Sequence, residues 1–292
     1  MAVEKEWAGT TYGNGWMHKW LIRMLRLCNV RVFYVFVAVF VVPVCLVVNP
    51  GRRTTYRYFR ERWGLTPLRA MWKTYRNFCL FGQVVVDKFA MYAGKKFDVE
   101  IEGYEVFRSR AAKPEGFMQL SAHIGNYEIA GYTMTSEKKL NALVYAGEKE
   151  SVMNNRNRLF DSHNINMIGI RSDMSHMFEI NNALGNGEIV SMAADRMFGS
   201  TKSVTQTLLG REAEFPMGPF AVATSRGVDV IAVNVMKVAA TKYRIYVTAL
   251  DYDKTASRRE QTEQLSRAYV AELERMLRMY PEQWYNYYEF WK

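Results

Sequence analysis

The sequence predicts an α/β fold, on two observations. From about residue 97 onward, short runs of β-branched or apolar residues alternate with segments of helical periodicity, a pattern typical of α/β domains. The apolar content of 49% over 292 residues is also sufficient for a substantial hydrophobic core. We expect strands at residues 97–101, 117–122, 143–145, 189–193, 230–236 and 243–250. Helices are expected at about residues 125–135, 151–162, 173–185, 217–226 and 257–279, the last beginning with a capping-box pattern.

The N-terminal part of the chain contains an apolar run of 17 residues, at positions 32–48. As a helix this run extends about 25 Å at about 1.5 Å per residue, slightly less than the roughly 30 Å of a bilayer's hydrocarbon core. It could therefore span a thin bilayer or enter one leaflet, and Pro43 could bend it. A buried strand or a core helix is the alternative interpretation.

The net charge of +10 is concentrated around this run. Residues 1–62 contain ten Lys or Arg residues and three Glu residues, a net charge of +7. Basic side chains at both ends of an apolar helix suit anionic lipid head groups. The charge therefore favours a membrane surface as a partner rather than nucleic acid, for which a basic stripe over a folded domain would be expected.

Two further N-terminal helices are predicted. Residues 16–27 have two Trp residues on one face and basic side chains on the other, as interfacial helices do. Residues 68–93 have a long, aromatic-rich amphipathic pattern. We therefore expect a membrane-associating helical region with an apolar anchoring helix at residues 1–96. A single mixed-sheet α/β domain with flanking helices would follow at residues 97–292, and no repeat or linker separates the two regions.

The candidate catalytic residues follow the predicted strand at 117–122. This strand runs into a turn containing Gly125 and Asn126, and ligands of open α/β sheets bind at such strand ends. His123 lies at this strand end and could accept a proton near neutral pH. Glu128, at the start of the next helix, could reach the far ring nitrogen. The pair resembles the base and orienting acid of a hydrolase triad without a serine nucleophile, although a hydrogen-bonded loop histidine has the same spacing.

Several classes of site lack support because their motifs are missing. The sequence has no Gly-x-Ser-x-Gly elbow, no Cys-x2-Cys or His-Glu-x2-His metal motif, and no Gly-x4-Gly-Lys-Ser/Thr phosphate loop. We therefore expect no metal and no other cofactor. The three cysteines, two of them in apolar stretches, predict free thiols and a reducing compartment.

The spacing of His123 and Glu128 resembles the His-x4-acid signature of the lysophospholipid acyltransferase superfamily. Other segments resemble one branch of it, the lipid A late (lauroyl/myristoyl) acyltransferases. Residues 187–196 are similar to a strand of that branch that ends in Asp-Gln or Asp-Arg. Residues 209–223 resemble its Phe-Gly-x-x-Ala segment, and Pro-Glu-Gln-Trp at 281–284 resembles its C-terminal motif. These landmarks occur in order over nearly the whole chain.

The chain also departs from this branch. Residues 286–291 replace the usual Trp-x-His-Arg-Arg-Trp-like ending, and Arg196 replaces a commoner glutamine. Residues 215–220 are more similar to a subgroup associated with aryl-polyene or flexirubin-type lipids. These departures affect the assignment of the acceptor more than that of the chemistry.

The resemblance implies transfer of a fatty acyl chain from acyl carrier protein or acyl-CoA to a hydroxyl of a lipid A precursor, an aryl-polyene lipid or a glycolipid. His123 would remove the hydroxyl proton while Glu128 orients the imidazole. Arg196 could bind a phosphate or instead pair with Asp195. Second-tier substrate-binding candidates are Gly125, Asn126, Arg158, Asp195 and Arg196, of which the first two could offer backbone N–H groups to an oxyanion.

Two other functions stay open on the sequence. One is a membrane-associated lipid or thioester hydrolase, which would use water in place of the lipid hydroxyl. The other is a non-catalytic membrane adaptor. For each of these, and for the acyltransferase, the expected location is the inner (cytoplasmic) membrane, with the folded domain on the cytoplasmic side.

Overall fold

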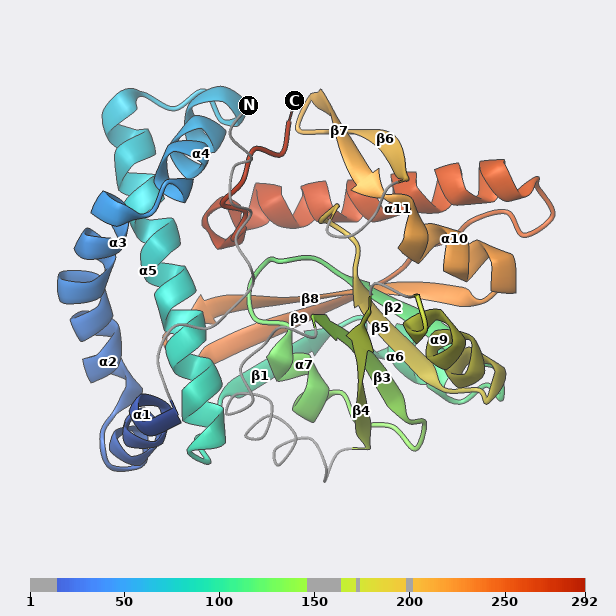
Figure 1. Cartoon of the computed structure of the whole chain (residues 1–292), viewed down its shortest axis with the longest axis horizontal. Helices are drawn as coiled ribbons and strands as arrows, with labels where there is room; N and C mark the ends of the chain where they lie inside the picture. Colours follow the sequence, from blue (N-terminus) through green and yellow to red (C-terminus); the bar gives the residue numbers. More distant parts are fainter. Residues whose placement is uncertain (1–14, 146–163, 172–173, 198–201, 292) are drawn as a thin grey trace.

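The computed structural model describes residues 15–145, 164–171, 174–197 and 202–291. Its centre is a seven-stranded sheet in the order β1-β9-β8-β2-β5-β3-β4 (Figure 1). The strands of this sheet are β1 (Asp98–Glu102), β2 (Phe117–Ser121), β3 (Leu140–Tyr145), β4 (Ile165–Ile170), β5 (Ile189–Ala193), β8 (Asp229–Ala239) and β9 (Lys242–Ala249). A separate two-stranded hairpin consists of β6 (Ser203–Leu208) and β7 (Arg211–Pro216).

The sheet is mixed. Strand β2 lies at its centre and runs parallel to both neighbours, β5 and β8. Strands β3 and β4 continue the parallel part, whereas β9 is antiparallel to β8 and parallel to the edge strand β1. Every residue of β2 is buried, as expected of a parallel strand that is covered on both faces. The predicted mixed-sheet α/β fold is therefore confirmed.

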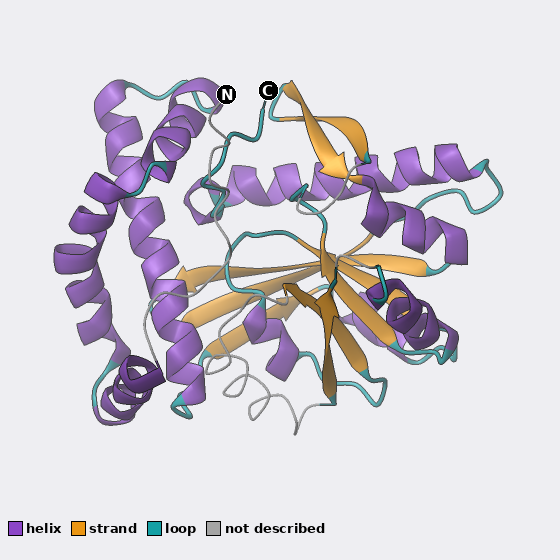
Figure 2. Cartoon of the chain, in the orientation of Figure 1, coloured by secondary structure: helices purple, strands orange, loops and turns teal. Residues whose placement is uncertain are grey.

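Helices cover both faces of the sheet (Figure 2). They are α6 (Tyr104–Ala111), α7 (Glu128–Thr133), α9 (His176–Gly185), α10 (Met217–Arg226) and α11 (Arg258–Met279). Leu120 of β2 packs in one hydrophobic cluster with residues of α9, α10 and α11. Phe117 of the same strand packs in another cluster with residues of α6 and α7, because alternate strand residues point to opposite faces. Helix α11 begins with the expected capping box.

The N-terminal helices form a layer beside the sheet, on the left of Figures 1 and 2. They are α1 (Gly15–Leu27), α2 (Val30–Phe36), η1 (Val37–Val41), α3 (Val42–Val48), α4 (Gly51–Arg57), η2 (Tyr58–Arg62) and α5 (Pro67–Tyr92). Residues Val30–Val48 form a helix that is long and apolar enough to cross a membrane, by length and composition. Only 17% of its apolar stretch is buried inside the molecule. The alternative of a buried strand or core helix is therefore wrong.

Pro43 lies inside this helix without ending it. The turn before it, Val37–Val41, is π-helical. A proline ring clashes with the carbonyl four residues earlier and offers no N–H, and a wider turn relieves both problems. On its inner side the helix packs on α5, where Val30 and Tyr34 share a cluster with Phe89.

Three strands were missing from the prediction. Among the described strands, β4 lies at the edge of the sheet and pairs with β3. β6 and β7 form a largely polar hairpin, and the two residues that join them, Leu209 and Gly210, have the positive φ values of a tight hairpin turn without its usual Asn-Gly signature. The predicted helix at 151–162 lies outside the described residues. The domain boundary at residue 96 stays a prediction.

Candidate active site

His123 lies just beyond the carboxyl end of β2, as predicted. The backbone N–H of His123 donates to Oδ2 of Asp195 at 2.9 Å, and its Nδ1 lies 2.7 Å from Oδ1 of the same carboxylate. Asp195 follows β5, the strand beside β2, so His123 and Asp195 lie beyond the carboxyl ends of two adjacent parallel strands. The imidazole is 32% exposed, whereas the Asp195 side chain is only 2% exposed. The histidine is therefore accessible, and its partner is not.

The carboxylate of Asp195 sets the chemistry of the ring. Because it accepts from Nδ1, the neutral imidazole carries its proton there, and Nε2 has a lone pair. None of the described residues is hydrogen-bonded to Nε2. Burial alone would raise the pKa of Asp195, but its attraction to His123 and Arg196 and its two hydrogen bonds with His123 outweigh that effect and hold the pKa below its ordinary value. Asp195 therefore stays ionised beside a ring that can accept a proton at Nε2.

Glu128 does not contact the His123 ring, contrary to expectation. It is the first residue of α7, where its carboxylate forms an ion pair with Lys88 at 2.9 Å and accepts from the Tyr92 hydroxyl at 3.3 Å. Both partners belong to α5. The position that we predicted for Glu128 on the imidazole is occupied by Asp195.

The turn after His123 explains this difference. Gly125 has a φ of +55°, and a Cβ atom there would lie 1.8 Å from the carbonyl oxygen of Val235 in β8. Only glycine allows the chain to pass so close to β8. The chain then turns toward α5, so Glu128 emerges away from the imidazole.

The backbone N–H groups expected to bind an oxyanion are already engaged. Gly125 donates to the carbonyl of Gln283 at 2.9 Å, and Asn126 donates to the carbonyl of Val235 at 2.8 Å. The Asn126 side chain is buried and lies 3.4 Å from the Tyr243 hydroxyl. In this structure both residues shape the turn, and the oxyanion role that we expected for their N–H groups is not supported.

Comparison with known families gives one match over most of the chain. Residues 69–292 match the family described as bacterial lipid A biosynthesis acyltransferase. The chain belongs to this family. It is therefore an acyltransferase, whose substrates are an acyl donor and a lipid acceptor.

Two further comparisons add little. No curated protein matches the acyltransferase. Among solved structures, the 1-acyl-sn-glycerophosphate (LPA) acyltransferase PlsC from Thermotoga maritima is similar at 18% sequence identity and a TM-score of 0.41, covering 92% of this chain and all of the other.

The C-terminal segment of the acyltransferase, residues 285–291, lies against the His123–Asp195 pair. The N–H of Tyr285 donates to the carbonyl of His123 at 3.0 Å, and the Tyr288 hydroxyl donates to the carbonyl of Asp195 at 3.2 Å. Arg196 donates to the carbonyl of Tyr285 at 3.0 Å, and its guanidinium lies over the Tyr288 ring. Arg196 thus contacts the C-terminal segment, while its charge also helps to lower the pKa of Asp195.

Other sequence candidates are not brought to the site. Arg158, within the basic patch at 154–158, lies outside the described residues. The described part of the acyltransferase holds no group of three or more His, Cys, Asp or Glu side chains that could bind a metal ion.

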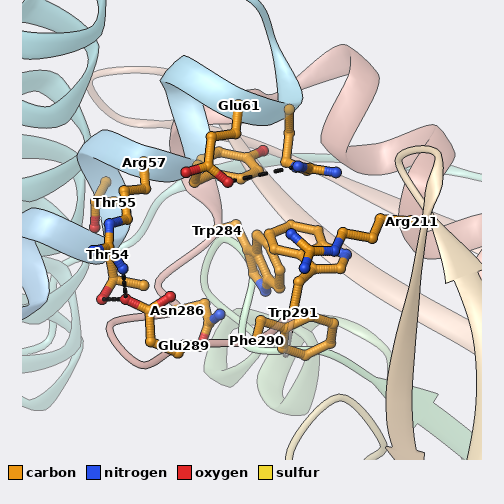
Figure 3. A pocket seen from close by; sticks show the side chains of 12 residues that line it. Thr54, Thr55, Arg57, Glu61, Arg211, Trp284, Asn286, Glu289, Phe290 and Trp291 are labelled. Atoms are coloured by element: carbon orange, nitrogen blue, oxygen red, sulfur yellow. Dashed lines mark hydrogen bonds and ion pairs between the residues drawn. The ribbon is translucent and has the colours of Figure 1, made fainter.

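A recess beside the C-terminal segment is lined by aromatic and charged side chains (Figure 3). Its charges are largely neutralised within it, because Arg57 pairs with Glu289 at 2.9 Å and Arg62 lies 3.6 Å from Glu61. The His123 ring is not part of its lining. The recess is therefore separate from the candidate catalytic pair.

Sequence reasoning missed two aspects of the site. Lys88 and Tyr92 of α5 contact Glu128, and the only signal for them was that Asp87 and Lys88 are the charged residues of the otherwise uncharged second half of this helix. The sequence predicts Asp195 only as a secondary substrate-binding candidate, whereas in the structure its carboxylate binds the imidazole of His123. Its signal was its position directly after a predicted strand.

Proposed function

We propose that this acyltransferase moves a fatty acyl chain from a thioester, of acyl carrier protein or CoA, to a hydroxyl of a lipid, with His123 as the general base. The observation that carries the proposal is the contact between Nδ1 of His123 and the buried carboxylate of Asp195 at the carboxyl end of β2. This contact directs the lone pair of Nε2 to the side of the ring that Asp195 does not cover. A base held in this way contributes roughly 10²–10⁴-fold to the rate.

The proton moves through Nε2 in both halves of the reaction. As the lipid oxygen attacks the thioester carbonyl, a C–O bond forms and the hydroxyl proton passes to Nε2. The C–S bond then breaks, and the imidazolium returns the proton to the leaving sulfur. Atoms and charge balance without a cofactor, and the ring ends as it began.

Asp195 has the orienting role in this proposal. Its carboxylate fixes the tautomer of His123 and stabilises the imidazolium that forms during the transfer. Glu128 supports the site from the other side of the turn, through its ion pair with Lys88. Gly125 and Asn126 hold the turn, and Arg196 is a candidate for contacting a phosphate of the donor or the acceptor.

The acceptor that the family description favours is a lipid A precursor. An aryl-polyene lipid is an alternative, because residues 215–220 are similar to the subgroup associated with such lipids, and a glycolipid is a third candidate. Acyl carrier protein and acyl-CoA carry the same thioester and phosphate-bearing arm, so the proposed chemistry applies to both.

We also propose that the helix Val30–Val48 lies in one leaflet of the inner membrane rather than across it. Its first turns are tied to the folded domain, because the Tyr34 hydroxyl accepts a hydrogen bond from Lys237 at 3.1 Å. Its other end packs beside Tyr287 of the C-terminal segment. A spanning helix would draw β-strand edges and loops into hydrocarbon, where their polar groups would be unsatisfied.

The outer faces of the N-terminal helices fit this position. Their exposed apolar side chains belong to α1, to the apolar helix Val30–Val48 and to α5, and together they suit the lipid surface. They include Trp16, Trp20 and Leu27 of α1, Val35, Phe40 and Val47 of the apolar helix, and Leu68, Met71 and Trp72 of α5. The catalytic domain would then face the cytoplasm beside this surface.

A single assay tests the proposed activity. The protein in detergent micelles is incubated with dodecanoyl-acyl carrier protein or dodecanoyl-CoA, labelled in the acyl chain, and a tetra-acylated lipid A precursor or a bacterial lipid extract. A labelled lipid with one additional chain is expected. Release of free labelled fatty acid in place of a labelled lipid would contradict the proposed transfer to a lipid hydroxyl.

A further inference from the structure

The Pro-Glu-Gln-Trp motif at 281–284 has no part in the chemistry proposed above. It follows α11 and begins with a short 3₁₀ turn, η4 (Pro281–Gln283). The chain then runs antiparallel to the turn that carries His123, where Ile124 and Trp284 form an isolated β-bridge. The motif therefore lies directly against the candidate catalytic residue.

Helix α5 fixes the motif on both sides of Gln283. The carboxylate of Glu282 pairs with Lys73 at 2.5 Å and Arg76 at 3.1 Å. The fully buried amide of Asn77 donates to the carbonyl of Glu282 at 2.9 Å and to that of Trp284 at 2.8 Å. Gln283 is thereby held in place with its side chain directed at the sheet.

The side chain of Gln283 binds both backbone groups of Lys237 in β8. The N–H of Lys237 donates to Oε1 at 2.9 Å, and Nε2 donates to the carbonyl of Lys237 at 2.7 Å. Gln283 is only 5% exposed, so these bonds are shielded from water. One buried amide thus pairs with β8 as a neighbouring strand would.

This pairing replaces β2 at the point where β2 ends. The register of β2 on β8 stops at Leu120 and Ala232. Beyond it, the N–H of Asn126 binds the carbonyl of Val235, and Gln283 binds Lys237 two residues further on. The loop after His123 and the motif therefore complete one edge of β8 together.

The same contacts hold the backbone of His123. Its carbonyl accepts from the N–H of Tyr285, and the N–H of Gly125 donates to the carbonyl of Gln283. Because Gln283 is anchored on β8 by its side chain and on the turn by its carbonyl, a displacement of this side chain shifts the peptide that carries the imidazole.

We infer that Gln283 is a positioning residue, which holds the His123 turn against β8 and so places Nε2 for proton transfer. The inference rests on the proposed role of His123. It gives the Pro-Glu-Gln-Trp motif a function: Glu282 ties it to α5, Gln283 to β8, and Trp284 to the turn. A displacement of about 1 Å at a catalytic group can lower a rate on the order of 100-fold.

The test compares Gln283→Ala with a matched control, Gln261→Ala. Gln261 is also a buried glutamine, 3% exposed, whose Nε2 donates to two backbone carbonyls, those of Lys254 at 3.1 Å and Ala256 at 2.7 Å. Turnover is followed as thiol released from dodecanoyl-acyl carrier protein in micelles of a bacterial lipid extract. We expect Gln283→Ala to lower kcat about 100-fold with little change in the KM for the donor. Gln261→Ala should lower the melting temperature by a similar amount and keep kcat.

A second variant, Gln283→Glu, keeps the volume and covers the case in which Gln283→Ala does not fold. Its carboxylate still accepts from the N–H of Lys237, but it can donate to the carbonyl only when protonated, and burial raises its pKa. The ratio of its kcat to that of the wild type should therefore rise as the pH falls. Wild-type kcat in Gln283→Ala overturns the inference, as does wild-type kcat in Gln283→Glu over the whole pH range or an equal loss in Gln261→Ala.

The variant His123→Ala, measured in parallel, separates this inference from the proposed function. If His123→Ala keeps wild-type turnover, the proposed general base is wrong. If His123→Ala is inactive while Gln283→Ala keeps its kcat, only the positioning role of Gln283 is wrong.

Discussion

His123 and Asp195 each lie two residues beyond a register pair of parallel strands. Ser121 of β2 faces Ala193 of β5, and neighbouring strands lie about 4.8 Å apart. The segments after β2 and β5 leave the sheet at the same end. The carboxylate of Asp195 therefore reaches both the backbone N–H and Nδ1 of His123. This relationship, rather than spacing along the chain, defines the candidate catalytic pair and leads to the first two predictions.

Replacement of the imidazole removes the general base. His123→Ala should lower kcat roughly 10²–10⁴-fold, while the KM for the acyl donor changes little. The measurement is label transfer from dodecanoyl-acyl carrier protein. His176→Asn is a suitable control, because His176 lies in α9 and its Nδ1 accepts a hydrogen bond from the backbone N–H of Arg171 at 3.2 Å. Wild-type turnover in His123→Ala would rule out the assignment.

Loss of the orienting charge should affect the rate and the tautomer together. In Asp195→Asn the amide cannot stabilise an imidazolium, so kcat should fall on the order of 10²–10⁴-fold with the fold retained. Nitrogen NMR of labelled His123 should show that the Nδ1–H tautomer of the wild type is lost. An Asp195→Asn variant with the wild-type tautomer and rate contradicts the proposed role.

The ion pair of Glu128 and Lys88 should be measurable as a coupling. The two side chains are 7% and 15% exposed, and loss of one charge of such a buried pair costs about 3–5 kcal/mol. We expect both Glu128→Gln and Lys88→Met to lower the free energy of unfolding, and the double variant to be less destabilised than the sum of the two. Urea denaturation of the wild type, the two single variants and the double variant completes this double-mutant cycle. Strict additivity of the changes in unfolding free energy would show that the pair is not coupled.

The pH dependence of stability should carry a contribution from Asp229. Hydrogen bonds from Lys113 and Lys254 lower the pKa of this carboxyl from 3.8 to about 2 in the folded protein. Since the folded pKa lies below the unfolded one, the stabilisation is complete above about pH 4 and disappears as the pH falls to about 2. The difference in melting temperature between the wild type and Asp229→Asn should shrink over that range. A difference that is constant with pH would exclude this origin.

Apolar residues on the proposed membrane face should control binding to lipid. Leu68 and Trp72 are 78% and 59% exposed, and a charge at either position should weaken binding to vesicles of phosphatidylglycerol and phosphatidylethanolamine by on the order of ten-fold. Sedimentation of vesicles with Leu68→Glu and Trp72→Glu measures the effect. Phe178→Glu is the control, because Phe178 is 75% exposed but lies on α9. Release of the wild type by high salt alone would contradict an apolar attachment.

Much of the fold was predictable because its signals are local. Runs of apolar and β-branched residues marked five strands of the mixed sheet closely, and the periodicity of α10, α11 and α5 gave their extents within a few residues. The hairpin β6–β7 escaped because its strands are mostly polar and its turn carries Leu209, which is an unusual residue at positive φ.

The sequence by itself determined that a histidine follows the central strand, that an apolar helix precedes the sheet, and that a Pro-Glu-Gln-Trp motif lies at 281–284, after the last predicted helix. It did not determine the histidine's partner. Asp195 is 72 residues away from His123, and only the adjacency of β2 and β5 brings the two together. Glu128 is five residues away, but the close passage of Gly125 over β8 turns it toward Lys88. Strand order and long-range backbone contacts, which no local pattern encodes, decided which acid binds the imidazole.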